Sequence, residues 1–134
     1  RRAVGAGRRV LVLHVTADAA ALAALAAAVG PAWGRDVVAA PPCPVGTAAA
    51  LLLRCGRFLC NDTGIMHVAG ALPVPTLALF GPTDPLLWKP PAPEVAALTS
   101  VRQAPDARGG EFGWMETIGV DEVWAAWDAL PARG

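Results

Sequence analysis

The chain has 134 residues, of which 54% are hydrophobic, and this apolar content is enough for the core of one compact domain. Its 11 basic and 11 acidic side chains cancel, so no overall field attracts it to nucleic acid or to an anionic membrane surface. We therefore expect a single domain, residues 1–134, that has no nucleic-acid partner and binds its ligands at local sites.

Strands and helices are predicted to alternate over the first eighty residues. After a polar lead (residues 1–9), the run Val10–Val15 predicts a buried strand, and Asp18–Val29 predicts a helix that Asp18 caps. The next predicted elements are a strand near Val37, a helix over 45–56, a strand over 57–60, a helix over 63–72 and a strand over 75–80. This alternation predicts an α/β fold with a mostly parallel, Rossmann-like sheet flanked by helices.

The pattern changes after residue 80. The prolines of residues 81–93 predict a loop rather than a helix or a central strand, and residues 95–100 predict an edge strand. Residues 101–118 show no periodicity and predict a long loop. An apolar stripe at helical spacing predicts a C-terminal helix over 119–130.

The cysteines and the apolar runs indicate the compartment. The sequence has three cysteines, Cys43, Cys55 and Cys60, an odd number that does not favour a framework of disulfides. They also lack metal-ligand spacing, so we expect reduced thiols in the cytoplasm and no metal site. No apolar run approaches the roughly 20 residues of a transmembrane helix, and no signal peptide is recognisable, so a soluble chain is expected. The chain begins without methionine, and we expect it to be a piece of something longer.

A polar turn, Asn61–Gly64, lies between a predicted strand and a predicted helix, where doubly wound sheets bind ligands. Amides at a helix start lack internal partners and the helix dipole favours anions, so a phosphate or diphosphate is expected there. Gly64 allows close approach, Thr63 adds a hydroxyl, and His67 follows one helical turn later. Asp62 would repel phosphate, so it either caps the helix or accepts hydrogen bonds from sugar hydroxyls.

Simpler interpretations of these residues stay open. The Asp-Thr-Gly sequence is also typical of an N-cap and turn, and His67 is also typical of an interior or rim histidine. His14, at the end of the first strand, is either a core residue or a site residue. Met66 and Trp88 are expected to pack in the interior.

The segment Asn61–Pro85, NDTGIMHVAGALPVPTLALFGPTDP, resembles the signature of glycosyltransferase family 9, the ADP-heptose:lipopolysaccharide heptosyltransferase family. Both have an Asp-Thr-Gly-x-x-His turn, an alanine-rich helix, an apolar strand and Phe-Gly-Pro-Thr. The likeness extends more loosely over most of Val10–Leu130. It implies the GT-B architecture of two Rossmann-like domains, in which this chain is the C-terminal, nucleotide-sugar-binding domain. The first strand and loop of that domain have no match in residues 1–7, so the domain is expected to be incomplete at its N-terminus.

The resemblance also implies roles for individual residues. Thr63 and Gly64 would contact the phosphates of the donor, Asp62 its sugar hydroxyls, and His67 its diphosphate region. The resemblance implies two further donor contacts. Asp18 lies near the position of an acidic residue that contacts the ribose in the family, and Cys43 lies at a position that lines the family's adenine pocket.

The resemblance implies a reaction that inverts the configuration at the anomeric carbon. It also implies that the reaction needs no metal and no cofactor; the substrate is an ADP-sugar or a related nucleotide sugar. The general base belongs to the N-terminal domain, so no catalytic residue is expected in this chain.

The expected function is the donor-binding part of an inverting glycosyltransferase that transfers a heptose-like sugar to a lipopolysaccharide-type or related glycan. The enzyme would be cytoplasmic and would work at the inner face of the cytoplasmic membrane. This chain alone is expected to be inactive, because the acceptor domain and the general base are absent. The alternative is a non-catalytic α/β module that binds a nucleotide or another anion.

Overall fold

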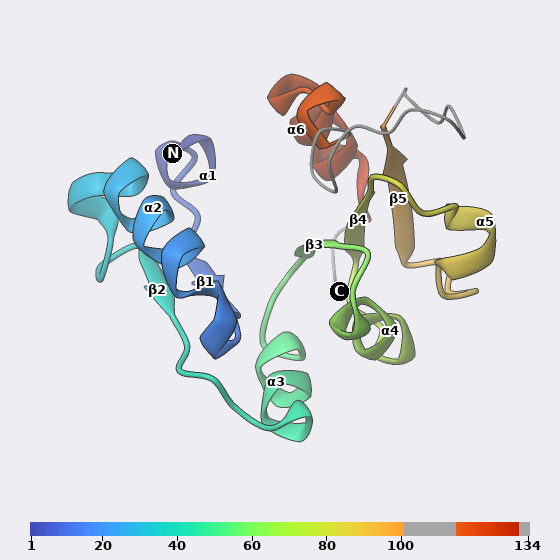
Figure 1. Ribbon diagram of the computed structural model, residues 1–134, viewed down its shortest axis with the longest axis horizontal. Coiled ribbons are helices and arrows are strands. Elements are labelled where there is room, and N and C mark those ends of the chain that lie inside the picture. Colours follow the sequence, from blue (N-terminus) through green and yellow to red (C-terminus); the bar gives the residue numbers. More distant parts are fainter. Residues whose placement is uncertain (101–114, 132–134) are drawn as a thin grey trace. The chain divides into compact units, whose positions relative to one another are not determined.

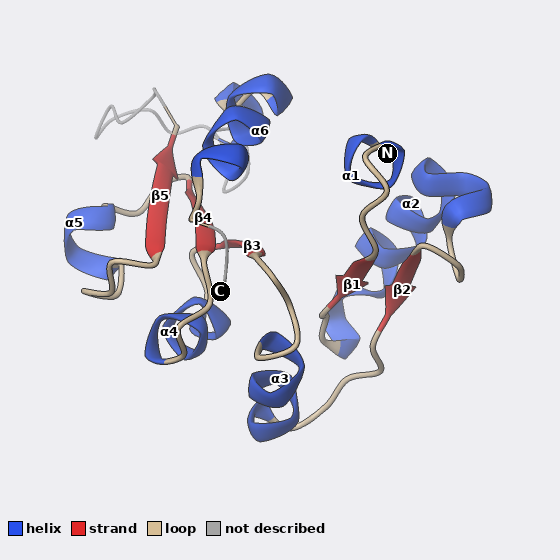
Figure 2. Ribbon diagram, turned by 180° about the vertical axis from the view of Figure 1, so that it is seen from behind, coloured by secondary structure: helices blue, strands red, loops and turns tan. Residues whose placement is uncertain are grey.

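A computed structural model describes residues 1–100 and 115–131. The described chain divides into two compact units, Arg1–Ala48 and Ala49–Gly134, and each unit contains a parallel sheet with helices (Figures 1 and 2). The predicted α/β class is therefore confirmed, whereas the prediction of a single domain stays a prediction. Most of the predicted loop over 101–118 lies outside the described residues.

The first unit is built around two parallel strands. Its elements are α1 (Arg2–Gly5), β1 (Val10–Val12), the 3-10 turn η1 (Thr16–Asp18), α2 (Ala19–Val29), the 3-10 turn η2 (Gly30–Ala32) and β2 (Val37–Ala39). Val10 lies opposite Val37, and Val12 lies opposite Ala39. The predicted polar lead thus contains a one-turn helix, and the first strand is shorter than the apolar run that predicted it.

Helix α2 matches its prediction closely, but its start is formed differently. Gly30 ends the helix with a φ of 67°, a conformation that favours glycine. Asp18 does not cap α2 with its side chain; its Oδ2 accepts a hydrogen bond of 2.9 Å from the Val15 amide instead. The predicted cap is therefore wrong, because the carboxylate is used to close the preceding turn.

The second unit holds three parallel strands in the order β3-β4-β5, with helices around them (Figure 2). Helix α3 (Val45–Leu52) leads into it from the first unit. The elements that follow are β3 (Phe58–Asn61), α4 (Gly64–Ala71), β4 (Thr76–Phe80), α5 (Pro85–Trp88), β5 (Val95–Thr99), the 3-10 turn η3 (Met115–Thr117) and α6 (Val120–Ala129).

The core of the second unit surrounds the central strand β4. Ala78 and Phe80 on β4 pack with Met66 of α4 and Val95 of β5, and all four side chains are buried. Parallel strands covered on both faces read as continuous apolar runs, which explains why this strand is visible in the sequence. The prediction that Met66 packs in the interior is confirmed.

Helix α4 also depends on close packing at Gly70. A Cβ atom added there would lie 2.8 Å from the Pro90 Cβ and 2.9 Å from its Cγ. Real side chains do not approach this closely, so the absence of a side chain lets α4 rest against the Pro90 loop.

Residues 81–93 differ from their prediction as a loop, because they contain the one-turn helix α5. Pro85 is its first residue, where the missing N–H would have no helical partner in any case. The Asp84 side chain caps it by accepting a 2.8 Å hydrogen bond from the Leu86 amide. Trp88 was expected to pack in the interior, but it is 55% exposed, so that prediction is wrong.

Arg57 ties the C-terminal helix α6 to the start of β3. Its Nη1 donates to the Trp127 carbonyl at 2.7 Å, and its Nη2 donates to the Leu130 carbonyl at 2.8 Å. The guanidinium also lies 6.0 Å from the centre of the Trp127 ring. One side chain thus bonds two carbonyls at the end of α6: that of Leu130 and that of Trp127, which also accepts from the Leu130 amide at 3.3 Å.

Candidate functional site

The Asp62–Gly64 turn connects β3 to α4 at the carboxyl edge of the parallel sheet. The Asp62 amide donates to the Leu79 carbonyl at 3.1 Å, which extends the pairing of β3 with β4 by one residue. Thr63 is extended, with φ −150° and ψ 163°, and helix α4 begins at Gly64. The sheet therefore fixes the turn where ligands bind in open α/β folds.

The start of α4 has no side-chain cap. Thr63 occupies the N-cap position, but its Oγ1 donates to the Asn61 carbonyl at 3.4 Å instead of accepting from the helix. Because Thr63 takes this position, the alternative that Asp62 is the capping residue is wrong. An uncapped first turn keeps its amides available to a ligand.

Three of the four predicted donor-binding residues are exposed beside this helix start: Thr63, Gly64 and His67. Their neighbours Met66 and Ala69 are fully buried, so α4 turns its apolar face to the core and leaves His67 outside. The interpretation of His67 as an interior histidine is therefore wrong.

Glycine at position 64 is not explained by the fold. Its φ is not among the positive values in the described chain, and a Cβ built on it would meet nothing within 4 Å. Neither backbone strain nor packing therefore requires glycine here, in contrast to Gly70 on the same helix. The open space in front of Gly64 fits a ligand that approaches the backbone closely.

Asp62 carries the charge of the turn, and a nearby thiol responds to it. Burial raises the pKa of Cys60 to about 12, and the negative charge of Asp62 contributes to this rise. The thiol therefore stays protonated at neutral pH, which disfavours a role as nucleophile. Cys60 packs against the core instead, as expected for a small apolar side chain.

Asp18 and Cys43, the two further donor-binding candidates, belong to the first unit. Asp18 is exposed and Cys43 is half-buried. Near them lies a cavity of about 410 Å³, whose lining includes Thr16 and Pro42.

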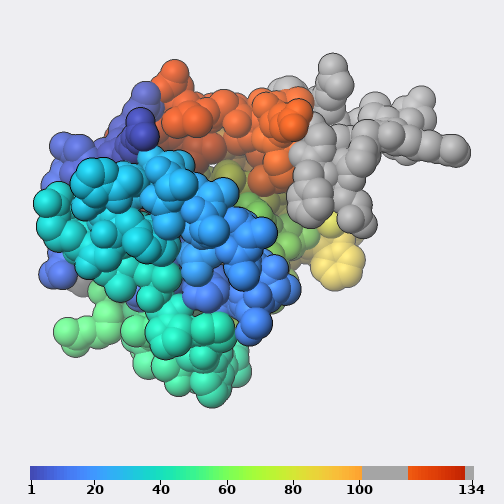
Figure 3. All heavy atoms as spheres, turned by 60° about the vertical axis from the view of Figure 1, so that its left-hand side comes forward, coloured from blue at the N-terminus to red at the C-terminus, as the bar shows by residue number. Residues whose placement is uncertain are grey.

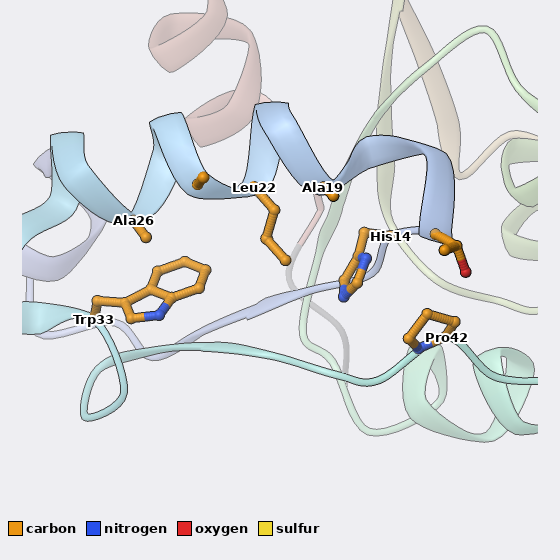
Figure 4. A pocket seen from close by; sticks show the side chains of 8 residues that line it. His14, Ala19, Leu22, Ala26, Trp33 and Pro42 are labelled. Carbon is orange, nitrogen blue, oxygen red and sulfur yellow. The ribbon is translucent and has the colours of Figure 1, made fainter.

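This cavity runs along α2, with His14 towards one end and Trp33 towards the other (Figure 4). Its helical wall consists of small or aliphatic side chains: Ala19, Leu22, Ala23 and Ala26. None of the residues of α2 is buried. Sequence analysis missed the cavity, since no motif marks it; the run of alanines was its only signal.

The described residues contain neither a metal-ligand cluster nor a membrane-spanning helix. Within residues 1–100 and 115–131, no three His, Cys, Asp or Glu side chains gather as metal ligands would. No helix in the same part of the chain combines the length and the apolar character needed to cross a membrane.

Comparison with known proteins gives a consistent family. The sequence model of glycosyltransferase family 9 (heptosyltransferase) matches residues 4–111. Lipopolysaccharide heptosyltransferase 2 from Salmonella typhimurium is 41% identical over 54 residues, which are 40% of this chain and 15% of that protein. Lipooligosaccharide heptosyltransferase 2 from Haemophilus influenzae is 39% identical over 51 residues, which are 38% of this chain and 14% of that protein.

A solved structure shows the same fold. The glycosyl transferase family 9 protein from Veillonella parvula superposes with a TM-score of 0.75 and 21% sequence identity, and the match covers 91% of this chain and 36% of that one. The matched part is thus a minor share of each of these longer relatives. Since the family model matches most of the sequence, the chain belongs to glycosyltransferase family 9, the heptosyltransferase family.

Proposed function

We propose that this chain is the donor-binding part of an inverting glycosyltransferase that uses a nucleotide diphosphate sugar. The sugar would be heptose-like, and the acceptor would be a lipopolysaccharide-type or related glycan held by an N-terminal domain outside this chain. The observation that carries the proposal is the family match over residues 4–111, which includes the exposed turn at the carboxyl edge of the sheet.

The turn offers a suitable place for the diphosphate. The uncapped first turn of α4 presents backbone N–H groups and the positive end of the helix dipole. Thr63 can donate its hydroxyl to a phosphate in place of its long 3.4 Å bond to the Asn61 carbonyl, and Gly64 leaves room for a phosphate to reach the backbone. Asp62 is free of the N-cap role, so its carboxylate is suited to accept hydrogen bonds from sugar hydroxyls.

These groups would act on the leaving group of the reaction. The oxygen of an acceptor hydroxyl forms a bond to the anomeric carbon, while the bond from that carbon to the diphosphate oxygen breaks on the opposite face. The hydroxyl proton goes to a carboxylate base outside this chain, and the nucleoside diphosphate departs with the bonding electrons. Negative charge therefore grows on the diphosphate, where one well-placed donor such as His67 contributes roughly 3 kcal/mol. In this proposal transfer needs no metal ion.

Two donor-binding candidates of the first unit, Asp18 and Cys43, stay part of the proposal. Asp18 would accept from the ribose, and Cys43 would line the pocket of the base. Asp18 retains acceptor capacity for this role, because only its Oδ2 is engaged, by the Val15 amide.

The test is calorimetric titration of the protein with ADP, UDP and GDP. Replacing Thr63 by Val or His67 by Ala should weaken binding of the preferred nucleotide roughly tenfold, equivalent to about 1.4 kcal/mol. Thr47→Val, at an exposed position of α3, is the matched control and should bind normally. Unchanged affinity in both turn variants would refute the assignment.

Transfer itself is measured in a longer protein that includes the acceptor domain. There, His67→Ala should lower kcat more than it raises KM, because charge on the diphosphate is greatest in the transition state. Nucleotide binding without any transfer would instead favour the alternative, a non-catalytic binding module.

A further inference from the structure

Helix α5 exposes three consecutive large apolar side chains, here called the α5 patch. Leu86 is 91% exposed, Leu87 is 77% exposed and Trp88 is 55% exposed. No large hydrophobic side chain in the described part of the chain is more exposed than Leu86. Figure 3 shows yellow atoms in the colour range of α5 at the surface. Monomeric soluble proteins seldom leave such side chains together in water, so the patch suggests a contact with something apolar.

The α5 patch is held rigidly in this exposed position. The Leu87 and Trp88 amides both donate to the Asp84 carbonyl at 3.1 Å, and the Asp84 side chain accepts from the Leu86 amide. On the other side, Pro90 rests against α4 at Gly70. Figures 1 and 2 both place α5 at the outer side of β5, the edge strand of the sheet. The side chains are therefore presented outward by a fixed turn.

The size of the α5 patch argues against a second protein as its partner. A stable protein interface uses roughly 20–30 residues and about 800 Å² on each side. One helical turn with three apolar side chains does not supply this area. Peripheral binding to a bilayer has no such minimum area, because its strength scales with the apolar surface inserted about 5–10 Å into the headgroup boundary and with the attraction to anionic lipid.

The chemistry of the α5 patch and its neighbours also fits a lipid surface. Tryptophan is favoured at the level of lipid headgroups, where its ring is apolar and its N–H is wet. Lys89 follows Trp88 directly. Its ammonium donates one hydrogen bond of 3.2 Å to the Pro90 carbonyl and has further N–H donors for an anionic headgroup. The carboxylate of Asp84 would oppose such a headgroup, but its Oδ1 is already bonded to the Leu86 amide.

We propose that the α5 patch inserts into the headgroup region of a bilayer that contains anionic lipid and holds the second unit at its surface. The idea rests on the proposed function in one respect, since a lipopolysaccharide-type acceptor would be met at such a surface. The physical contact itself needs only Leu86, Leu87, Trp88 and Lys89.

The test is co-sedimentation of the protein with phosphatidylcholine vesicles, with and without phosphatidylglycerol. The double variant Leu86→Ser/Leu87→Ser should reduce the vesicle partition coefficient roughly tenfold or more, because both apolar side chains are lost. Val120→Ser is the matched control: Val120 is 74% exposed on α6, and its replacement should leave partition unchanged. Lys89→Gln should weaken binding only to the vesicles that contain phosphatidylglycerol.

Three results would overturn the inference. The first is that the protein does not bind either kind of vesicle, and the second is that the double variant binds them as tightly as the parent. The third is a dimer, seen by analytical ultracentrifugation, that the double variant abolishes, because the patch would then join two copies. ADP titration of the same double variant separates this inference from the proposed function. Retained ADP affinity with lost vesicle binding supports both, whereas vesicle binding without any nucleotide binding refutes only the proposed function.

Discussion

Two glycines on helix α4 are expected to respond in opposite ways to the same substitution. A Cβ at Gly64 would meet nothing within 4 Å, whereas a Cβ at Gly70 would lie 2.8 Å from the Pro90 Cβ and 3.4 Å from the Val95 Cγ2. Gly64→Ala therefore adds a methyl group in open space at the proposed donor site. Gly70→Ala adds the same methyl group inside a packed contact of the same helix.

The expected magnitudes follow from these distances. Alanine is favoured over glycine within a helix by up to about 1 kcal/mol, so Gly64→Ala should leave the free energy of unfolding unchanged or slightly raised. At Gly70, overpacking costs about 1–3 kcal/mol and outweighs the same gain. For nucleotide binding, Gly64→Ala should be the more harmful of the two substitutions. The methyl group at position 64 would stand between the backbone and a phosphate and should weaken ADP binding roughly tenfold or more.

Urea denaturation and ADP calorimetry on both variants decide the matter. Gly70→Ala should lower the denaturation midpoint, and below that midpoint it should still bind ADP. Gly64→Ala should keep the midpoint and lose affinity. A ligand at the turn is refuted if Gly64→Ala is stable and binds ADP like the parent protein. It is also refuted if Gly64→Ala unfolds as readily as Gly70→Ala, because glycine would then be needed for folding.

Three further predictions concern the residues around the turn and at the base of β3. Arg57→Ala should lower the free energy of unfolding by about 2–4 kcal/mol, because two charge-assisted hydrogen bonds to α6 are lost, and Arg57→Lys should recover only part of this in urea denaturation. Because the Cys60 pKa rises from 9.0 to about 12 on folding, stability should fall above pH 9 until about pH 12, more steeply in the parent than in Cys60→Ala. Asp62→Asn should leave the urea midpoint unchanged, because Thr63 holds the N-cap position, but should reduce discrimination between nucleotide sugars in competition titrations.

The elements that sequence predicted best are those whose signals are local. Val10 and Phe80 lie in apolar runs that form parallel strands, and Gly30 ends α2 where glycine was expected. Each signal acts within a few residues of the structure it specifies. The alternation of strands and helices could therefore be read directly from the sequence.

Features that depend on distant partners could not be predicted in this way. Arg57 bonds to carbonyls 70 and 73 positions later, and nothing in the sequence near Arg57 marks that contact. Helix α5 was missed because prolines argue against helices in general, whereas Pro85 lies in the first turn, where a missing N–H is harmless. The exposure of Trp88 was missed for the same reason, since a loop gives no indication of which side chains face outward.

The turn itself suggests why its residues point to function more clearly than the buried ones. Met66 and Gly70 are explained by packing, because the fold would lose a core contact or suffer a clash without them. Thr63 is at the N-cap without capping, Gly64 has no steric need to be glycine, and His67 is turned away from the core. Because the fold does not require these side chains, binding to a ligand explains their identity better than packing does. For this reason substitutions at Thr63, Gly64 and His67 should separate binding from stability, whereas a turn that was merely structural would lose both together.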